Sequence, residues 1–430
     1  MNYKSLLNFF ALFIIFHFTA SGQEETKGLS IHKSLQEYTD EIFQELVDIR
    51  RDLHRNPEIS GREQRTSEKI AEFLESQGLE VKTHIGGYGV VGILNGSKEG
   101  KSIAWRADID AMPSNIPDVV DFESENPGVR HICGHDVHTA IGMGIAKVLA
   151  RHKEQIEGTV YFIFQPAEET YEGAKAMIDD RLYEVIDADE IYGIHISPFP
   201  VGTIATKSGH IYAHTNIVEV KYGNTNNEEA KISRTKDWIK SFQNISPESK
   251  FWNLENLGDA EAGIESPNTV FKDFFIVKEK FNVEIKNDQL IITATLSTDN
   301  KSQLESFPVA LEKKIKESEF SKDLVSVRYS YEKAVVINDE DLTQSSINSI
   351  KDIYGEKSII PVYGIVTGDR GDDFAFFQKS IPGVYFYLGG ANYETGVISM
   401  PHAPDFKVDE ESIRFGVKYF SSMIVERVNE

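Results

Sequence analysis

The sequence holds a single cysteine among 430 residues, Cys133, and this scarcity limits how the fold can be stabilised. One cysteine cannot form a disulfide within its own chain, so a scaffold held together by disulfides is excluded. Positive charge is also scarce, with 45 Lys and Arg against 68 Asp and Glu and a formal net charge of −23. This balance argues against nucleic acid or an anionic lipid surface as a partner.

Long hydrophobic runs are absent after the N-terminus, so no later segment is expected to cross a membrane. At the N-terminus, Lys4 precedes an apolar run over residues 6–19, and small residues follow at 20–22. This pattern predicts a secretory signal peptide over 1–22 and export to the periplasm or the cell exterior, with no membrane attachment after cleavage. An uncleaved anchor is the weaker alternative, because the run is short for a span and His17 interrupts it.

The chain as a whole is 40 % apolar, which is enough to build substantial cores. Helical periodicity predicts helices over 39–57 and 62–77 and a buried helix over 138–151. Between them lie apolar strands that read LEVKTHI, VVGIL, SIAWRAD, TVYFIFQ and EIYGIHI. This alternation predicts an α/β domain, with a mixed sheet covered by helices on both faces.

The pattern changes between residues 212 and 334, where a polar stretch rich in Asn and Glu runs to about 275. The segment FNVEIKNDQLIITATLS then predicts a hairpin that turns at Asn287 and Asp288. A helix over 300–319, the strand LVSVRYSYE, helices over 339–353 and 409–427 and the strand VYFYLGG complete the chain. We therefore predict one domain in two parts, 23–211 and 335–430, interrupted by a smaller α+β domain over 212–334.

Residues 87–92, GYGVVG, fit the glycine pattern of dinucleotide-binding proteins, and Asp108 lies about 20 residues further on. In those proteins the pattern opens a helix, whereas VVGIL is β-branched and leads into a turn at Asn95 and Gly96. The sequence therefore predicts a strand, a turn and a strand here, and no nucleotide cofactor.

The lone cysteine lies in the segment RHICGHDVH, close to His131, His135 and His138. A single cysteine is most often a small buried hydrophobe. In an exported protein, however, a thiol is exposed to oxidation unless it is buried or binds a metal. The surrounding imidazoles favour a metal ligand.

Other candidate ligands follow the predicted strands. Asp108 and Asp110 come after SIAWR, the pair Glu168 and Glu169 follows TVYFIFQ, and His195 ends EIYGI. Ligands collect at the carboxyl ends of strands in open α/β sheets. An acidic pair is more often a solvated surface feature, but this pair follows an apolar strand and a proline. Thiolate, imidazole and carboxylate together suit Zn²⁺, with Mn²⁺ or Co²⁺ as alternatives.

Several segments together resemble the M20 metallopeptidases, in particular the amidohydrolase branch that includes hippurate hydrolases, N-acyl-amino-acid amidohydrolases and auxin-conjugate hydrolases. These segments are DLHRNPEIS (52–60), RADIDAMP (106–113), NPGVRHICGHDVHTA (126–140), GTVYFIFQPAEE (158–169), YGIHISPFPVGTI (192–204), and GDDFAFFQKSIPGVYFYLGG with MPHAPDF (371–390 and 400–406). They occur in the family's order at both ends of the chain, which is far more specific than any one of them.

The resemblance implies a site with two divalent metal ions, Zn or Mn and alternatively Co. It implies one general base, Glu168, and five ligands: Cys133, His135, Glu169, His195 and His402. Four residues of the same motifs are expected to orient ligands or substrate: Asp108, Asp110, Asp136 and His138. His54 also matches, although it could equally pack or cap a helix, and three further histidines are expected to be bystanders: His131, His210 and His214.

The inserted domain departs from the family. Family members carry Gly-Gly-His near the start of this lid, and its histidine helps to stabilise the oxyanion. The corresponding segment here, YAHTNIVEVKYGNTNNEEAKISRTKDW, contains neither Gly-Gly-His nor the Pro-His that usually follows. The family's Asn-Val-Ile-Pro stretch is at best a remnant at 267–270, and the Arg after the lid hairpin is replaced in TATLSTDN. Losing an oxyanion donor typically costs about 10²–10³ in rate, so we expect a specialised or slow enzyme, or another lid group such as His214 or a lysine in this role.

The sequence thus predicts an exported, metal-dependent amidohydrolase that cleaves the amide of a small N-acyl amino acid or dipeptide-like substrate with activated water. A homodimer through the lid is one hypothesis, because related proteins often dimerise there, and the sequence leaves the oligomeric state open. A second hypothesis is a non-catalytic, metal-containing relative that binds a ligand through its rebuilt lid. A thiol hydrolase using Cys133 with a histidine is the weakest, because it leaves Glu168, Glu169 and His402 without a role.

Overall fold

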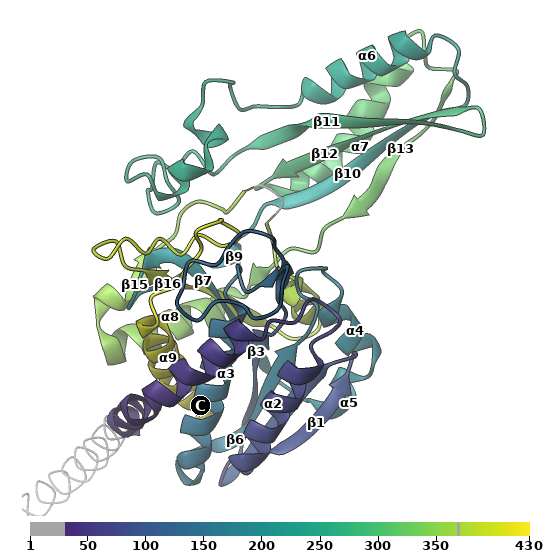
Figure 1. The fold of residues 1–430 in the computed structure, drawn as a ribbon. Helices are drawn as coiled ribbons and strands as arrows, with labels where there is room; N and C mark the ends of the chain where they lie inside the picture. Colours follow the sequence, from purple (N-terminus) through teal and green to yellow (C-terminus); the bar gives the residue numbers. More distant parts are fainter. Residues whose placement is uncertain (1–30, 368–369) are drawn as a thin grey trace, which may run out of the picture. The chain divides into compact units, whose positions relative to one another are not determined.

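The computed structural model describes residues 31–367 and 370–430, and the predicted signal peptide over 1–22 lies outside them. The chain divides into two compact units (Figure 1). The first unit holds the described residues up to Ile204, together with Gln344–Ile359 and Phe386–Glu430. The second unit holds Ala205–Thr343 and Ile360–Tyr385. The domain limits drawn from the sequence stay predictions.

One sheet of eight strands, in the order β1-β2-β6-β3-β7-β16-β8-β15, contains the main strands of the first unit, and parts of β8, β15 and β16 fall within the residues of the second unit. Its strands are β1 (Glu80–Ile85), β2 (Gly89–Asn95), β3 (Lys98–Asp108), β6 (Glu157–Gln165), β7 (Glu190–Pro200), β8 (Ile204–Thr206), β15 (Ile359–Pro361) and β16 (Gly383–Ala391). The sheet is mixed, because β2 is antiparallel to β1 and β6 whereas β3 is parallel to β6 and β7. The carboxyl ends of β3, β6 and β7 therefore meet at one edge of the sheet.

Helices cover both faces of this sheet, as the apolar strands predict. All nine residues of β16 are buried, whereas a strand with one wet face would alternate. An added Cβ at Gly92 of β2 would meet Leu74 of α2 (Gln64–Ser76), and at Gly89 it would meet Met177 of α4 (Gly173–Asp179). Because these two positions face opposite ways along a strand, α2 and α4 lie on opposite faces.

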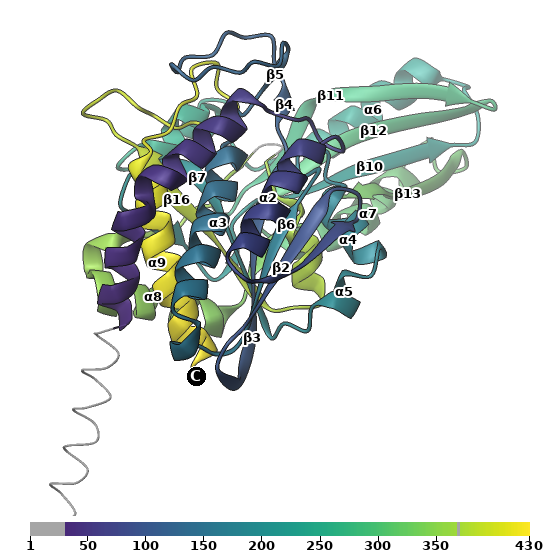
Figure 2. The ribbon, with the colours of Figure 1, turned by 60° about the horizontal axis from the view of Figure 1, so that its bottom comes forward.

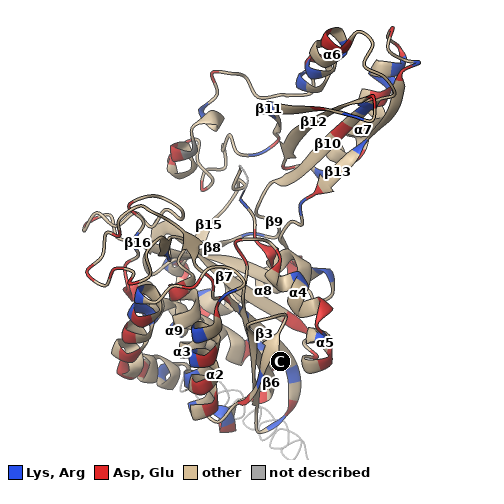
Figure 3. Ribbon diagram, turned by 45° about the vertical axis from the view of Figure 1, so that its right-hand side comes forward, with Lys and Arg blue, Asp and Glu red and all other residues tan. Residues whose placement is uncertain are grey.

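A layer of helices lies along the α2 face, as Figure 2 shows for helix 31–55, α2, α3 (His135–Arg151) and α9 (Glu411–Val428). Acidic and basic residues are frequent along helix 31–55 and α2, whereas β6 and β7 each hold a single charged residue, Glu157 and Glu190 (Figure 3). No helix in the described ranges combines the length and apolar character that a bilayer span requires.

Several predicted elements are confirmed with shifted starts. The first helix is already present at residue 31, ahead of the predicted start at 39, and α3 begins at His135 rather than 138. Residues 87–92 form part of a turn and of β2, which confirms that the glycine pattern does not open a helix. Gly78 ends α2 as predicted, with φ of 82° in the left-handed region that glycine tolerates.

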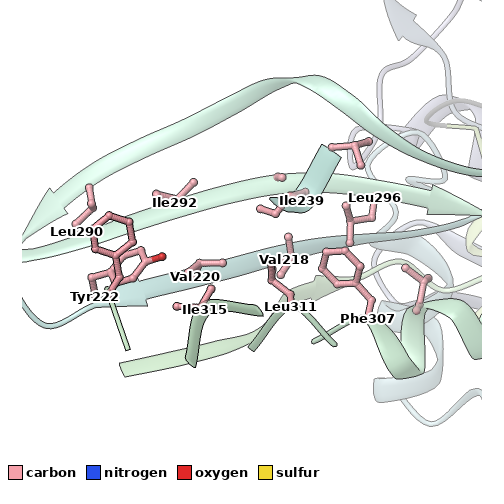
Figure 4. Close-up of a cluster of buried hydrophobic side chains, with 14 of the residues drawn as sticks. Val218, Val220, Tyr222, Ile239, Leu290, Ile292, Leu296, Phe307, Leu311 and Ile315 are labelled. Atoms are coloured by element: carbon pink, nitrogen blue, oxygen red, sulfur yellow. The ribbon is translucent and has the colours of Figure 1, made fainter. Parts of the chain in front are cut away.

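The second unit contains a four-stranded antiparallel sheet in the order β11-β12-β10-β13. Its elements are β10 (His214–Tyr222), α6 (Glu228–Lys240), β11 (Phe275–Lys286), β12 (Gln289–Thr298), α7 (Lys301–Lys316) and β13 (Leu324–Glu332). The predicted hairpin turn at Asn287 and Asp288 is confirmed, with both residues at positive φ. Both helices pack on one face of the sheet, where Figure 4 shows Val218 and Val220 of β10 beside Leu311 and Ile315 of α7.

Helix α6 was not predicted from the sequence, and Lys231 explains why. This residue occupies a fully buried position on α6 where helical periodicity expects an apolar side chain. Its Nζ lies 2.9 Å from Oδ2 of Asp323 and 2.7 Å from Oδ1 of Asn224, so its charge is paired inside the unit. A buried lysine at a core position hides the pattern by which an amphipathic helix is recognised.

Candidate metal centre

The parallel strands bring the candidate ligands to one edge of the first unit. Asp108 is the last residue of β3, and the loop with Glu168 and Glu169 follows β6 directly. His195 lies in β7, two residues beyond the pairing of Arg106 with Gly193. Parallel pairing of β3 with both neighbours therefore places these side chains at the same level of the sheet.

Cys133 reaches this edge through a tight turn ahead of α3. Gly134 has φ of 98°, and a Cβ at this position would lie 2.4 Å from Cγ2 of Ile196. Only glycine fits such a position. The turn leaves Cys133 in the loop and makes His135 the first residue of α3, and both side chains are buried.

The thiol of Cys133 lies at the centre of the five candidate ligands. Its Sγ lies 3.2 Å from Nε2 of His195 and 3.1 Å from Nε2 of His402. Oε1 of Glu169 lies 3.4 Å from Nε2 of His402 and 3.8 Å from Nε2 of His135. Two groups, each with ligand atoms within 4.8 Å of one another, share this thiol: Cys133 with His135 and His195, and Cys133 with Glu169 and His402. We call these the thiol-sharing groups.

Metal ions would satisfy atoms in these groups that have no other partner. Nε2 of His135 and Oε1 of Glu169 are buried and lack a hydrogen-bond partner within the described part of the chain. A buried polar atom left unpaired costs about 1–3 kcal/mol, so native proteins normally pair such atoms with protein, water or an ion. Sulfur, imidazole nitrogen and carboxylate oxygen around one point form a donor set for divalent cations such as Zn²⁺. The residues therefore fit metal ions.

The protonation of the thiol supports a ligand over a nucleophile. Burial raises the pKa of Cys133 well above its ordinary value, and the nearby carboxylate of Glu169 raises it further. A neutral thiol is a poor nucleophile, whereas coordination to a cation deprotonates a thiol outright. Burial of the thiol thus favours a ligand over a nucleophile.

His138 is held by partners at both ring nitrogens. Its Nδ1 lies 2.6 Å from Oδ1 of Asp108, and its Nε2 accepts the N–H of Ile196 at 2.8 Å. This histidine therefore links β3 to the backbone beside His195 and leaves no nitrogen for a metal. Burial raises the pKa of Asp108, but His135 and Arg106 outweigh it and hold this pKa well below its usual range.

Asp110 orients two of the candidate ligands. The Nδ1 of His135 lies 2.9 Å from the Asp110 carbonyl oxygen and 3.1 Å from its Oδ1. Because Nδ1 of His135 is the donor in these contacts, its Nε2 faces the thiol-sharing groups. The other carboxylate oxygen, Oδ2, accepts the N–H of Glu169 at 3.0 Å and the hydroxyl of Ser60 at 2.6 Å.

Asp136 belongs to a buried ionic network and to neither thiol-sharing group. Its Oδ2 accepts hydrogen bonds from Nε of Arg50 at 2.8 Å and from Nδ1 of His54 at 2.9 Å. Nε2 of His54 lies 3.0 Å from Oδ2 of Asp118. Burial lowers the pKa of His54, but Asp118 and Asp136 outweigh it and raise this pKa above its usual value. His54 thus connects two carboxylates rather than capping its helix.

The loops that carry Glu169 and His402 contain strained backbone. Ala167 has φ of 52° and His402 has φ of 65°, in a region that residues other than glycine rarely adopt. Such strain collects at functional sites and persists only where the surroundings hold it. The N–H of His402 donates to the carbonyl of Ile132 at 2.7 Å, and its side chain is 49 % exposed. His402 therefore has the most exposed side chain of the five candidate ligands.

The other histidines lie outside the thiol-sharing groups. His131 is buried, neither ring nitrogen has a partner among residues 31–367 and 370–430, and burial lowers its pKa to about 4. His210 and His214 belong to the second unit, where their rings lie 4.9 Å apart.

Three residues around the site received no role from the sequence. Ser60 and Arg106 hold Asp110 and Asp108, and both lie inside segments that carry the resemblance. Their place in those segments was the signal that could have identified them. Glu63 accepts the N–H of Ala167 at 2.8 Å. It lies just outside the segment at 52–60 and reads as an ordinary acid ahead of an amphipathic helix.

Comparison with known proteins decides the family. Residues 104–426 match Peptidase family M20/M25/M40. The chain belongs to this family. This M20 chain is 30 % identical over 406 residues to a Bacillus subtilis (strain 168) protein that carries the name amidohydrolase YhaA, with 92 % of this chain and 98 % of that protein covered. It is 29 % identical over 391 residues to IAA-amino acid hydrolase ILR1-like 4 of Arabidopsis thaliana, with 89 % and 86 % covered.

The M20 fold is also found in a solved structure. The Bacillus subtilis protein YXEP, described as a dinuclear metal binding peptidase from the M20 family, matches with a TM-score of 0.69 and 27 % identity. The match covers 90 % of this chain and 99 % of that one. These findings confirm the predicted family, the α/β fold and the enzyme class, a metal-dependent hydrolase that acts on amide bonds.

Proposed function

We propose that this M20 chain is an exported amidohydrolase that cleaves the amide bond of a small N-acyl amino acid or dipeptide-like substrate with water activated between two divalent cations. The observation that carries the proposal is the thiol of Cys133, which belongs to two ligand groups at once. In two-metal hydrolases the cations lie about 3.5–4 Å apart. A ligand residue that belongs to both groups would allow two ions to bind this close together. The dinuclear description of YXEP supports the same number of ions.

Five side chains would hold the cations. Cys133 with His135 and His195 forms one group, and Cys133 with Glu169 and His402 forms the other. The donor set suits Zn²⁺ or Mn²⁺, with Co²⁺ as the alternative. Two cations bound here supply Lewis acidity, which polarises an amide carbonyl and lowers the pKa of water towards neutrality.

Glu168 is the candidate general base. Its side chain is 7 % exposed, and its Oε2 lies 3.8 Å from Nε2 of His135, at the rim of the thiol-sharing groups. A carboxylate in this position takes the proton of the attacking water and returns it to the leaving nitrogen. Glu169 directly follows it in the chain and is anchored by Asp110, so one loop supplies a ligand and the base.

The names of two relatives support the substrate class. One carries the name amidohydrolase and the other IAA-amino acid hydrolase, and this chain covers 98 % and 86 % of them.

Chelation and metal addition test the proposal directly. The chain without residues 1–22 is treated with a chelator and assayed on a panel of N-acyl amino acids and dipeptides. We expect chelation to abolish turnover and Mn²⁺ or Zn²⁺ to restore it. Turnover that survives chelation but is lost after alkylation of Cys133 would instead establish a thiol hydrolase.

A metal-containing binding protein is the second candidate, and the turn after β10 favours it. This turn has no histidine at residues 223–227. Its Asn224 donates to Asp323 at 2.9 Å and accepts from Lys231 at 2.7 Å, so the turn serves the fold of the second unit. Stoichiometric metal without turnover across the whole panel would support this candidate.

Export and a homodimer through the lid complete the proposal. The N-terminal sequence alone supports export, and N-terminal sequencing of the protein recovered from the producing cells tests it: cleavage near residue 22 is expected. Sedimentation of the purified chain tests the dimer.

A further inference from the structure

Glu63 is a buried carboxyl group that the proposed chemistry does not use. Its side chain is 0 % exposed, and its Oε2 has no hydrogen-bond partner among the residues described. Burying an ionisable group with an unpaired oxygen is costly, so a carboxyl retained in such a place needs an explanation.

Capping of α2 does not explain Glu63. The residue stands at the N-cap of this helix, but its side chain makes no capping hydrogen bond. Glu58 caps the helix instead, because its two carboxylate oxygens accept the N–H groups of Arg65 at 3.1 Å and Thr66 at 2.8 Å. The Glu63 carboxyl is thereby free to serve another part of the first unit.

That part is the loop after β6. Oε1 of Glu63 accepts the N–H of Ala167 at 2.8 Å and the N–H of Gly61 at 2.9 Å. The first of these contacts joins residues 104 positions apart in the sequence. It holds Ala167, whose φ of 52° lies in the left-handed region, immediately before Glu168. A residue with this backbone geometry keeps it only when its surroundings fix it.

The loop is anchored on both sides of Glu168. Before this residue, the N–H of Ala167 is bound by Glu63; after it, the N–H of Glu169 is bound by Oδ2 of Asp110 at 3.0 Å. The carbonyl of Ala167 also accepts the N–H of Gly173 at 3.0 Å, which fixes the peptide group that follows Ala167. Two buried carboxyl groups thus hold alternate N–H groups of the loop that carries the candidate base and a candidate ligand.

We propose that Glu63 is a positioning residue for Glu168 and Glu169, acting through the N–H of Ala167, an inference that rests on the proposed function of these two residues. What the loop requires is an acceptor oxygen within reach of this N–H, not a negative charge. Partners that hold a metal ligand or base in place typically contribute 10- to 100-fold to metal affinity or activity.

The electrostatics of Glu63 agree with this role. Burial raises the pKa of its carboxyl to about 7, and the negative charge of Asp110 raises it as well, against the lowering effect of the N–H groups of Gly61 and Ala167. A protonated carboxyl still accepts through Oε1. The hydrogen bond to Ala167 therefore persists in both protonation states, and glutamine is a close mimic of the group.

Three variants separate the acceptor from the charge and the volume. Glu63→Gln keeps the acceptor, Glu63→Met keeps the chain length without an acceptor, and Glu63→Asp keeps the charge but withdraws the oxygens by one methylene. Glu72→Gln, on the exposed side of α2, is the matched control. Hydrogen exchange at residues 166–172, Mn²⁺ affinity, and kcat and KM on an N-acyl amino acid are measured for each.

For Glu63→Met and Glu63→Asp we expect faster hydrogen exchange in this loop, weaker Mn²⁺ binding, and a kcat about 10- to 100-fold lower at nearly unchanged KM. Glu63→Gln and the control Glu72→Gln should stay close to wild type. The proposal would be overturned if Glu63→Met left the loop exchange, the kcat and the Mn²⁺ affinity unchanged. It would also be overturned if Glu63→Gln lowered kcat and Mn²⁺ affinity as much as Glu63→Met does. If the Met variant does not fold, the Asp variant decides: wild-type behaviour there overturns the proposal. Hydrogen exchange reads the loop even if wild type cleaves no amide, so failure of the proposed function stays distinguishable.

Discussion

Glu168 and Glu169 are neighbours in sequence that occupy different surroundings. Oε1 of Glu169 lies buried beside His402 and lacks a hydrogen-bond partner in the described ranges, which is the environment of a ligand. Oε2 of Glu168 lies 3.8 Å from Nε2 of His135, and this carboxylate belongs to neither thiol-sharing group. The apolar strand before them identifies both acids in the sequence, and the family resemblance gives them different roles. The local pattern does not show where either side chain points, because adjacent residues on a loop can aim either way.

Replacing the base separates rate from metal binding. We expect Glu168→Gln to keep the metal content of wild type, because Glu168 belongs to neither thiol-sharing group, and to lose about 10²–10⁴ in kcat. Metal analysis and steady-state kinetics on the same sample measure both, with Glu154→Gln, an exposed residue of the short 3-10 helix Lys153–Gln155, as the control. An undiminished rate would reject the role of Glu168.

Glu63 predicts a pH dependence of stability in the metal-free protein. Its pKa of about 7 lies above the usual 4.5, so the folded protein holds this proton more tightly than the unfolded one. The tighter binding of this proton stabilises the folded protein by about 3 kcal/mol. This stabilisation is fully present below pH 4.5 and is lost as the pH rises through 7. The free energy of unfolding of wild type minus that of Glu63→Gln should fall by this order between pH 4.5 and 8. If this difference in the free energy of unfolding does not change with pH, the raised pKa of the buried Glu63 carboxyl is contradicted.

Among the secondary-structure elements, those with a clean apolar period are predictable from sequence and the others are not. Strands β3, β6 and β16 and helix α9 are apolar enough to be recognised, and strand ends locate the site. Helix α6 is hidden because Lys231 fills a core position with a paired charge. The partners of the site, such as Glu63 with Ala167, join segments 104 residues apart, and no local pattern encodes that distance.

The tight turn that joins Cys133 to α3 is expected to make the stability of the protein sensitive to substitution of Gly134. Gly134→Ala introduces a Cβ 2.4 Å from Ile196 at φ of 98°. We expect a loss of about 2–4 kcal/mol in the free energy of unfolding, from left-handed strain and overpacking together. Denaturant unfolding measures it, with Gly258→Ala, where a Cβ meets nothing within 4 Å, as the control. Equal stability of the two variants would show that the turn is not as tight as described.

Across the whole molecule, the site joins distant parts of one unit. Cys133 and His402 are 269 residues apart, and the second unit lies between them in the sequence. The family resemblance predicted this convergence, since the motifs at both ends of the chain keep the family's order. Local sequence patterns could not predict this convergence, because nothing in the sequence near residue 402 identifies Cys133 as its neighbour.

Metal binding is therefore expected to stabilise the first unit globally. An ion that binds only the folded chain adds about 2.7 kcal/mol at 100 times its Kd. We expect Mn²⁺ or Zn²⁺ to raise the Tm of the chelated protein, and Cys133→Ala to abolish most of this rise. Calorimetry with and without metal measures it, and a rise of equal size in the variant would place the binding elsewhere.

The central claim is that one thiol is shared by two cations, and metal stoichiometry tests it most directly. Elemental analysis of the purified chain after saturation with Mn²⁺ or Zn²⁺ and removal of free ions should find two ions per wild-type chain. Cys133→Ala should retain less than one, because both ligand groups lose their common atom. Two ions retained by Cys133→Ala, or a single ion in wild type, would contradict the account.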